Sequence, residues 1–431
     1  MRLPPNPGDL LPAALSCLLA LSTAAQADRL QEQVNRALDD ARPALLAHLR
    51  EVTQPPHRPG ELALVLLAAI HDGVPTDEPA FTAAVERLAK AVPEETYDLA
   101  LRLLVMEVLP TFPERAELAR RDVREMLAHR DGGGFHYSRN PKSWDLSNTQ
   151  YAALGLRAAK ALGVTIERSV WARMAKQVGD LQDNYGGFPY GNRDLQGAAS
   201  YASMTAAGIA VLAICRQALG EESQQDPTLL KQIGRGWLWL DRNKACLGST
   251  DERWSYYFHY GLERAAILCD VEKVGGADWY AQGAQMFVRD QLPGGGWAAV
   301  GDGGLTLGPP QGARRGLGTP VSTAFAVLFL RRKFQKVAGP ITPHIVTLAA
   351  VGPKAKVQDV DDCAAELVRR GKAAMPEVLQ ALRSEIEPQR RAAGKALLTI
   401  AGDGFGYDAA RDGEQNRDAI KKAELWFLRN R

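Results

Sequence analysis

The feature that most constrains this chain is a strict alternation of two kinds of helical segment. Segments of one kind have a single charged face and span residues 30–49, 79–91, 114–129, 167–182, 227–241 and 276–291. Segments of the other kind are apolar around almost their whole circumference and span residues 60–70, 97–109, 147–162, 201–219, 256–269 and 320–334. A helix with one polar face belongs on an outside, whereas an all-round apolar helix must be buried on several sides. Because strand-like alternation is hard to find, the pattern predicts an all-α fold of six concentric helix pairs.

A glycine-rich turn closed by an aromatic residue follows three of the amphipathic segments. These turns span residues 131–135, 184–188 and 294–297. Glycine can adopt the left-handed conformation that ends a helix, and the aromatic can then cover the exposed end. Phe135 and Phe188 are separated by the same offset as Gly155 and Gly208. This shared offset indicates an internal repeat of roughly fifty residues.

Two of these motifs carry a family resemblance. Gln182-Asp183-Asn184-Tyr185-Gly186-Gly187-Phe188 and Gln291-Leu292-Pro293-Gly294-Gly295-Gly296-Trp297 resemble the Q-x-x-x-G-G-x-W/F repeat of squalene–hopene cyclases. The same repeat occurs in protein prenyltransferase β-subunits. The resemblance covers about residues 30–335 and implies an α/α toroid over residues 28–336. It is specific for fold rather than chemistry, because the Gln and aromatic residues of the family repeat serve packing between helix pairs.

A different pattern begins after residues 336–340. Residues 373–382 and 389–400 form two short predicted helices, and the pair resembles a HEAT repeat. A final helix around Trp426 would cap the pair. Because a single such unit cannot bury its apolar face alone, residues 337–431 are expected to pack on a neighbouring helix or on the toroid.

The N-terminus has the pattern of a secretion signal over residues 1–27. Arg2 supplies a positive charge, residues 10–21 form a short apolar stretch, and Ala25-Gln26-Ala27 is a small-x-small cleavage site. An ordinary N-terminal helix is the alternative interpretation. No later apolar stretch is expected to reach the length needed to span a bilayer. The pattern therefore predicts export to the periplasm or the exterior, with no transmembrane span in the mature chain.

Charge and cysteine content exclude several classes of function. Lys+Arg 52 against Asp+Glu 50 gives a formal net charge of +2, so a nucleic-acid partner is not expected. The cysteines beyond the signal are Cys215, Cys246, Cys269 and Cys363, and none form a C-x-x-C pair. Buried free thiols are the favoured interpretation. The sequence leaves open an apolar small molecule or a protein as partner, and it does not indicate an oligomeric state.

Candidate site residues gather where the apolar helices begin, because the longer loops lie at those ends. One helix begins with Asp145, Asn148 and Gln150, and the next with Tyr201, Ser203 and Thr205. On a third, Tyr256, His259, Tyr260 and Glu263 are spaced to share one face. Together they could line a central pocket. The alternative is that they cap helices and bond to neighbouring helices, since buried polar groups need partners in any case.

Three further motifs do not indicate chemistry. His259 and Glu263 lack a third metal ligand. Cys269 lies too far along the same helix to join them, and the Asp-x-Cys motif of protein prenyltransferases does not occur. No metal or cofactor is therefore expected. Asp359-Val360-Asp361-Asp362 resembles the Asp-x-Asp-Asp acid motif of terpene cyclases, but it lies beyond the sixth pair and is typical of helix capping. Residues 294–318 lack a phosphate-loop ending, so Arg314 and Arg315 are interpreted as exposed loop charges.

The sequence therefore favours an exported, toroid-like binding or scaffold module without the catalytic residues of the resembled enzymes. The alternative is a divergent enzyme acting on an isoprenoid, a peptide or a polysaccharide, with Asp145, His259, Tyr260 and Glu263 as catalytic candidates. An enzyme should bring several of these groups together around an open hollow. A scaffold should have its centre filled, or these polar atoms paired among themselves.

Overall fold

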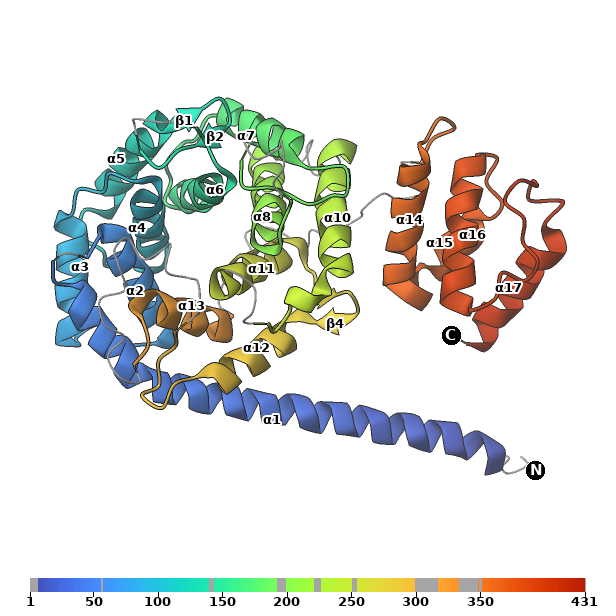
Figure 1. Ribbon diagram of the computed structural model, residues 1–431, viewed down its shortest axis with the longest axis horizontal. Helices are drawn as coiled ribbons and strands as arrows, with labels where there is room; N and C mark the ends of the chain where they lie inside the picture. The colour runs from blue at the N-terminus through green and yellow to red at the C-terminus, as the bar shows by residue number, and fades with distance from the viewer. Residues whose placement is uncertain are drawn as a thin grey trace.

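The computed structural model describes residues 7–55, 57–138, 143–191, 199–220, 226–249, 254–298, 317–332, 348 and 351–430. Side chains are described from residue 26 onward, except those of residues 358, 369, 370 and 373. The fold is all-α, as predicted (Figure 1). The described strands are two-residue pairs, β1 (Arg130–Asp131) with β2 (Gly134–Phe135) and β3 (Lys273–Val274) with β4 (Ala277–Asp278), both antiparallel.

The predicted alternation is present. The first amphipathic helix begins at Pro7 rather than at residue 30, and the other described boundaries lie within three residues of those expected. The apolar helices are α2 (Pro59–Asp72), α4 (Thr96–Val108), α6 (Leu146–Ala161), α8 (Ala202–Leu219), α11 (Ser255–Cys269) and α13 (Pro320–Arg331). The amphipathic helices are α1 (Pro7–Val52), α3 (Pro79–Lys90), α5 (Arg115–Ala128), α7 (Arg168–Leu181), α10 (Pro227–Arg242) and α12 (Trp279–Asp290). α12 begins later than predicted because residues 273–278 form the β3–β4 pair.

The apolar helices contact one another in a cyclic order. α2 packs on α4, α4 on α6, α6 on α8, α8 on α11 and α11 on α13, and α13 packs back on α2. Figure 1 shows these helices nearer the middle of the main body and the amphipathic helices around them. This arrangement explains why the apolar helices lack a polar face, since each is covered on several sides.

Local capping residues determine where several of these helices begin. Asp145, Asp226, Asp278 and Thr319 each accept a hydrogen bond from the first turn of the helix that follows. Proline occupies the first turn of α2, α3, α10 and α13, where its missing N–H costs nothing.

The aromatic turns pack as the repeat predicts. Phe135, Phe188 and Trp297 are fully buried, and a glycine in each turn has a positive φ. Gln182 Nε2 donates to the carbonyl of Gly186 in its own turn and to that of Gln232 on α10, at 2.9 and 2.8 Å. Gln291 Nε2 donates in the same way to Gly295 and to Ala37 on α1, at 2.8 and 2.7 Å. The glutamine therefore joins one amphipathic helix to the next, and the last to the first.

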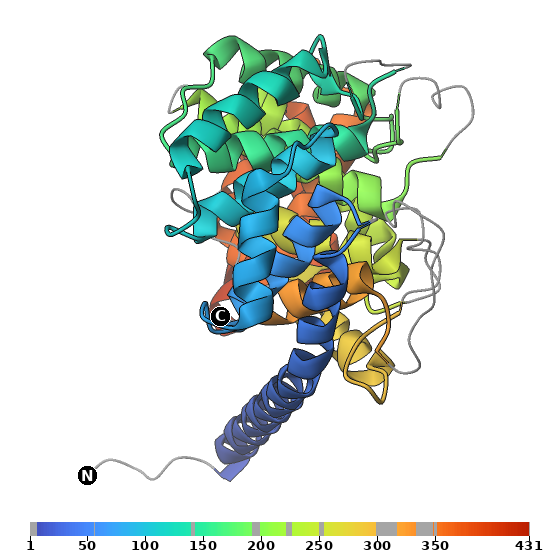
Figure 2. The same cartoon turned by 90° about the vertical axis from the view of Figure 1, so that its left-hand side faces the viewer.

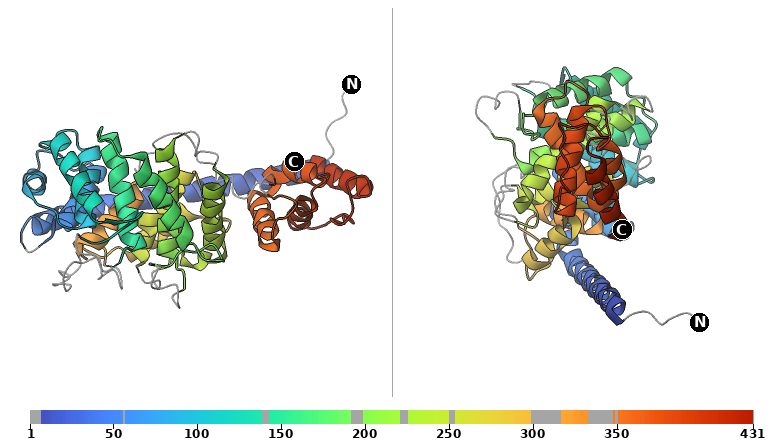
Figure 3. Two further views of the ribbon diagram at one scale, coloured as in Figure 1. Left: turned by 90° about the horizontal axis from the view of Figure 1, so that it is seen from above. Right: turned by 90° about the vertical axis from the view of Figure 1, so that its right-hand side faces the viewer.

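The C-terminal helical unit consists of α14 (Val357–Arg370), a 3₁₀ turn (Gly371–Ala374), α15 (Met375–Ala381), α16 (Glu387–Ala401) and α17 (Arg417–Arg429). It lies beside α10 of the main body (Figures 1 and 3), and α14 contacts α10. The predicted junction at residues 336–340 lies outside the described residues, as do Phe334, Arg314 and Arg315.

The N-terminal part of α1 extends away from the other helices (Figures 1 and 2). The helix continues through the predicted cleavage site Ala25-Gln26-Ala27, while Arg2 lies outside the described residues. The expectation that no later stretch reaches spanning length was wrong: among the described residues, Ala202–Leu219 is long and apolar enough to cross a membrane. That window is 89% buried, as expected for α8 at the centre of a packed helical body.

Candidate functional site

The starts of α4 and α6 lie together with the loops that precede the next apolar helices. The Thr96 N–H donates to the carbonyl of Tyr137 at 2.8 Å, and the Leu146 N–H donates to that of Tyr190 at 2.8 Å. These bonds bring Asp145, Tyr137 and Tyr190 to one place on the body. We call it the mouth.

Asp145 is the candidate that the mouth contains. It is buried and caps α6, because its two carboxylate oxygens accept hydrogen bonds from the N–H and the side-chain amide of Asn148, both at 2.8 Å. Burial raises the pKa of Asp145 to about 6, against the lowering effect of the bonds from Asn148 and Tyr190. Beside it, the Tyr137 and Tyr190 hydroxyls lie 3.0 Å apart, and Tyr137 is 45% exposed.

A hydrogen-bonded chain begins at Tyr97, whose ring stacks on that of Tyr137 with centroids 5.9 Å apart. The Tyr97 hydroxyl of α4 bonds to Ser147 Oγ of α6, and Ser147 Oγ lies 2.8 Å from the Tyr257 hydroxyl of α11. The Tyr257 hydroxyl in turn donates to Gln150 Oε1 at 2.8 Å. α6 and α11 are not neighbours in the cyclic order of apolar helices, so this chain joins helices across the middle of the body.

Aromatic rings fill the space around that chain. The Tyr151 ring centroid lies 4.3 Å from that of Tyr97, and 6.3 Å from each of those of Tyr257 and Tyr260. Phe325 of α13 adds contacts of 6.2 Å to Tyr257 and 4.9 Å to Tyr260. Burial raises the pKa of the tyrosines of this cluster, so they are neutral hydrogen-bonding groups at physiological pH. We call these residues the central tyrosine cluster: Tyr97, Tyr151, Tyr257, Tyr260 and Phe325.

His259 does not face this cluster. Its Nδ1 lies 2.8 Å from the carbonyl of Ser255, and its Nε2 accepts a hydrogen bond from the Gly248 N–H at 3.2 Å. Its ring contacts Phe287 of α12 and Phe329 of α13. Burial lowers the pKa of His259 to about 4, so the imidazole is neutral. Its surroundings are those of a packed structural side chain.

Glu263 and Tyr260 also have partners within the fold. Arg264 Nη1 donates to Glu263 Oε2 at 2.6 Å, which makes the two residues a buried charge pair. The Arg264 guanidinium also lies 3.2 Å from the centroid of the Tyr260 ring. A cation over the face of an aromatic ring is stabilised by the ring quadrupole.

The residues predicted to share one lining face of α11 do not all have the same neighbours. Tyr256 packs on Phe287 of α12 at 4.7 Å, on the same side as His259. Tyr260 packs instead on Phe325 of α13 and Tyr151 of α6, with ring centroids 4.9 and 6.3 Å away. A residue spacing defines an angle around a helix, but it does not say which neighbour lies at that angle.

The remaining candidates serve packing or lie apart from the mouth. Thr205 Oγ1 accepts the Phe188 N–H at 3.2 Å. Gln150 belongs to the hydrogen-bonded chain described above, and Ser203 is buried on α8. Tyr201, partly exposed, is the residue that precedes α8, and its side chain does not cap that helix.

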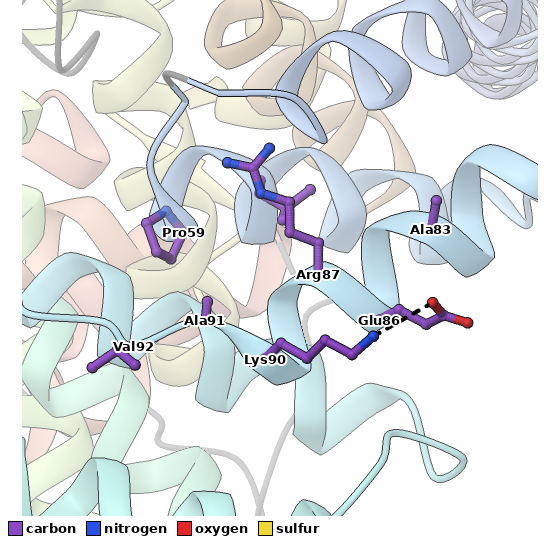
Figure 4. Close-up of a pocket in the computed structure, with 8 residues that line it drawn as sticks. Pro59, Ala83, Glu86, Arg87, Lys90, Ala91 and Val92 are labelled. Atoms are coloured by element: carbon purple, nitrogen blue, oxygen red, sulfur yellow. Dashed lines mark ion pairs between the residues drawn. The ribbon is translucent and has the colours of Figure 1, made fainter.

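Two pockets in the described part of the main body are lined by none of the candidate residues. One, of about 560 Å³, lies between the start of α2 and α3 (Figure 4). Arg87 within it donates to the carbonyls of Val52 and His57. The other, of about 430 Å³, is lined by Asp122 and Glu125 of α5. Asp122 accepts from Arg102 at 2.8 Å, and Glu125 lies 3.4 Å from His129, so these carboxylates already have partners.

The described part of the chain contains no side-chain cluster suited to metal binding or thiol catalysis. Those residues contain no group of three His, Cys, Asp or Glu side chains placed to hold a metal ion. Cys215, Cys246, Cys269 and Cys363 are buried free thiols, as favoured from the sequence. Burial raises the pKa of the Cys269 thiol to about 12, which makes a thiolate nucleophile unfavourable.

Sequence reasoning missed most of the central tyrosine cluster. Tyr97, Tyr151 and Tyr257 lie on helices that are apolar on all sides, and a tyrosine there looks like ordinary core. The available signal was the spacing of Tyr257, Tyr260 and Arg264, which places two hydroxyls and a cation on one side of α11. A comparison with protein-family models gave no match, and neither did a comparison with curated proteins.

Proposed function

We propose that this chain is an exported α/α toroid that acts as a non-catalytic binding or scaffold module. The cyclic packing of the apolar helices and the glutamine bridges between amphipathic helices support the toroid assignment. The C-terminal helical unit would then be a HEAT-like appendage. The positive residue, apolar stretch and small-x-small site of residues 1–27 are the basis for export.

The central tyrosine cluster is the observation that carries the proposal. Catalysis in a toroid needs reactive groups around an open cavity, whereas the Tyr97 and Tyr257 hydroxyls bond to Ser147 and Gln150 within the fold. The histidine and glutamate candidates are likewise held by Ser255, Gly248 and Arg264. The Tyr257 hydroxyl and both ring nitrogens of His259 therefore already have partners within the fold and have no spare hydrogen bond for a reacting molecule.

Replacing Tyr257 by Phe tests the non-catalytic role of the cluster. The change removes one hydroxyl and leaves Ser147 and Gln150 short of a partner. The free energy of unfolding in urea should therefore fall by about 2 kcal/mol. Tyr280→Phe is the matched control, because its hydroxyl donates to a single backbone carbonyl, that of Leu330, away from the cluster. Unchanged stability of Tyr257→Phe would contradict a structural role for this hydroxyl.

A turnover assay separates the scaffold from the divergent enzyme. Farnesyl diphosphate and squalene are suitable probes, since the resembled families act on isoprenoids. We expect product analysis by gas chromatography to show neither substrate consumed. Consumption of either probe that is lost in Asp145→Asn would overturn the scaffold proposal. Asp145 is the residue to vary because a carboxyl group with a pKa of about 6 is suited to general acid catalysis.

A further inference from the structure

The acidic segment Asp359–Asp362 of α14 contacts basic side chains of α10. Asp359 forms an ion pair with Lys231. Asp362 lies 3.6 Å from Arg235 and 3.5 Å from Arg242. Lys231, Arg235 and Arg242 occur four and seven residues apart along α10, so they form one basic stripe along it.

Helix capping accounts for only part of this segment. Asp359 Oδ2 accepts the Lys356 N–H at 3.2 Å, as a capping residue would. The Asp362 carboxylate, however, is 3% exposed and lies against α10. Asp361, between them, points back into its own unit and forms an ion pair with Lys395 of α16. The two outer aspartates therefore face the main body, and the middle one does not.

Arg235 connects this contact to the glycine-rich turn before Phe188. Besides approaching Asp362, its guanidinium donates to the carbonyls of Asp183 and Asn184, at 3.2 and 2.5 Å. A Cβ placed on Gly186 would lie 2.4 Å from the Arg235 carbonyl oxygen. A single residue of α10 thus holds both the turn and the C-terminal helical unit.

We propose that Asp359 and Asp362 are an electrostatic docking motif that seats the C-terminal helical unit on the basic stripe of α10. Through Arg235, docking stabilises the turn formed by residues 183–188. Undocking removes the Asp362 charge from Arg235 and loosens the turn. Because these ion pairs are partly exposed, added salt weakens them: the screening length is about 10 Å at 0.1 M and about 3 Å at 1 M ionic strength.

The first test is a salt titration of the unmodified full chain. Small-angle scattering should give a larger radius of gyration in 1 M than in 0.1 M NaCl. Hydrogen exchange at the amides of Tyr185 and Gly187, which donate to Asp183 Oδ1, should accelerate about fivefold, the size expected for losing a few surface ion pairs. An unchanged radius together with unchanged exchange would overturn the proposal, whatever the variants do.

The second test compares variants at 0.1 M NaCl. The double variant Asp359→Asn, Asp362→Asn should reproduce the high-salt radius and the faster exchange at Tyr185 and Gly187. Asp361→Asn is the matched control, one residue away on the same helix, and should leave both quantities as in the unmodified chain. Equal effects of the double variant and of Asp361→Asn would mean that α14 is merely destabilised, which contradicts docking.

A charge exchange separates docking from folding. Asp359→Lys alone should extend the molecule, and adding Lys231→Asp should restore both the compact radius and the slow exchange. Restoration requires that the two side chains meet. Failure to restore, with unchanged far-UV circular dichroism, would rule out the Lys231–Asp359 pair as part of the motif.

Discussion

At the residue scale, one threonine hydroxyl accepts a hydrogen bond from each aromatic turn and holds it in place. Thr149, Thr205 and Thr323, each in the first turn of an apolar helix, accept the N–H of Phe135, Phe188 and Trp297 at 3.0, 3.2 and 3.1 Å. These N–H groups are buried, and an unpaired buried donor costs free energy. Thr205, a pocket candidate from sequence, is therefore one member of a structural repeat.

Thr205→Val should destabilise the fold by about 2 kcal/mol, because valine fills the same space but leaves the Phe188 N–H without an acceptor. Thr205→Ser keeps the oxygen and should lose much less. Urea unfolding of both variants measures the difference. Equal losses would mean that the methyl group matters rather than the hydrogen bond.

Asp98 gives the protein a pH-dependent stability. Burial and the nearby charge of Glu95 raise its pKa to about 6 from 3.8, although the Gly60 N–H donates to it at 2.9 Å. The folded state therefore binds a proton more tightly than the unfolded state. The resulting stabilisation is present at low pH and is lost as pH rises through about 6.

Asp98→Asn keeps an oxygen acceptor for Gly60 and removes the titration. In the unmodified chain, the contribution of Asp98 to the free energy of unfolding should be about 1 kcal/mol larger at pH 5 than at pH 7. The variant should lose that difference, as measured by urea unfolding at both pH values. Asp180→Asn, which removes an exposed partner of Lys176, is the control. An identical pH dependence in the Asp98 variant and the unmodified chain would refute this assignment.

At the scale of elements, each aromatic turn packs against the next amphipathic helix. A Cβ on Gly133, Gly186 or Gly295 would lie 2.1, 2.4 or 2.0 Å from a backbone carbonyl oxygen of α7, α10 or α1. Real Cβ atoms do not approach so closely, so the turn and the neighbouring helix would have to separate. Close packing of turn on helix therefore requires glycine.

Gly186→Ala should cost more than the conformational strain alone. Gly186 has a φ of +96° and meets the α10 backbone. Gly163 has a φ of +84° with nothing within 4 Å, so Gly163→Ala isolates the strain, about 1 kcal/mol. We expect Gly186→Ala to lose at least twice as much in thermal or urea unfolding. Similar losses for the two variants would show that the turn can move away from α10.

At the scale of the whole molecule, Asp72 lies where the cyclic order of apolar helices closes, between α2 and α13. This buried carboxylate at the end of α2 accepts from Arg42 of α1 at 3.0 Å and from Arg331 of α13 at 2.9 Å. Residues from the first and last helices of the cyclic arrangement thus meet on one side chain. Removing a buried partner from such a group leaves uncompensated charge.

Asp72→Asn should destabilise the main body by about 2 kcal/mol, less than for a fully buried pair because Arg42 and Arg331 are partly exposed. Asp180→Asn, which disrupts only an exposed ion pair, should change stability by less than about 0.5 kcal/mol. Comparable free energies of unfolding for Asp72→Asn and the unmodified chain would show that the contact between α2 and α13 does not depend on this carboxylate.

The sequence by itself determined the all-α class, most of the helix boundaries and the aromatic turns, although not the start of α1 at Pro7. These features are local. A helix that is apolar on all sides, such as α8, must be buried, and a turn such as Gly186-Gly187-Phe188 must end a helix, whatever surrounds them. The capping role of Asp145 was also weighed from sequence, because a cap depends on residues three positions away.

Only the tertiary structure decided which side chains meet. The sequence placed His259 and Tyr260 on one face, yet His259 packs on Phe287 of α12 and Phe329 of α13. Tyr260 instead packs on Phe325 of α13 and Tyr151 of α6. Asp72 with Arg331 and Asp362 with Arg235 are likewise separated by more than a hundred residues. Periodicity sets the angle of a side chain on its own helix, but the packing of distant helices decides what lies at that angle.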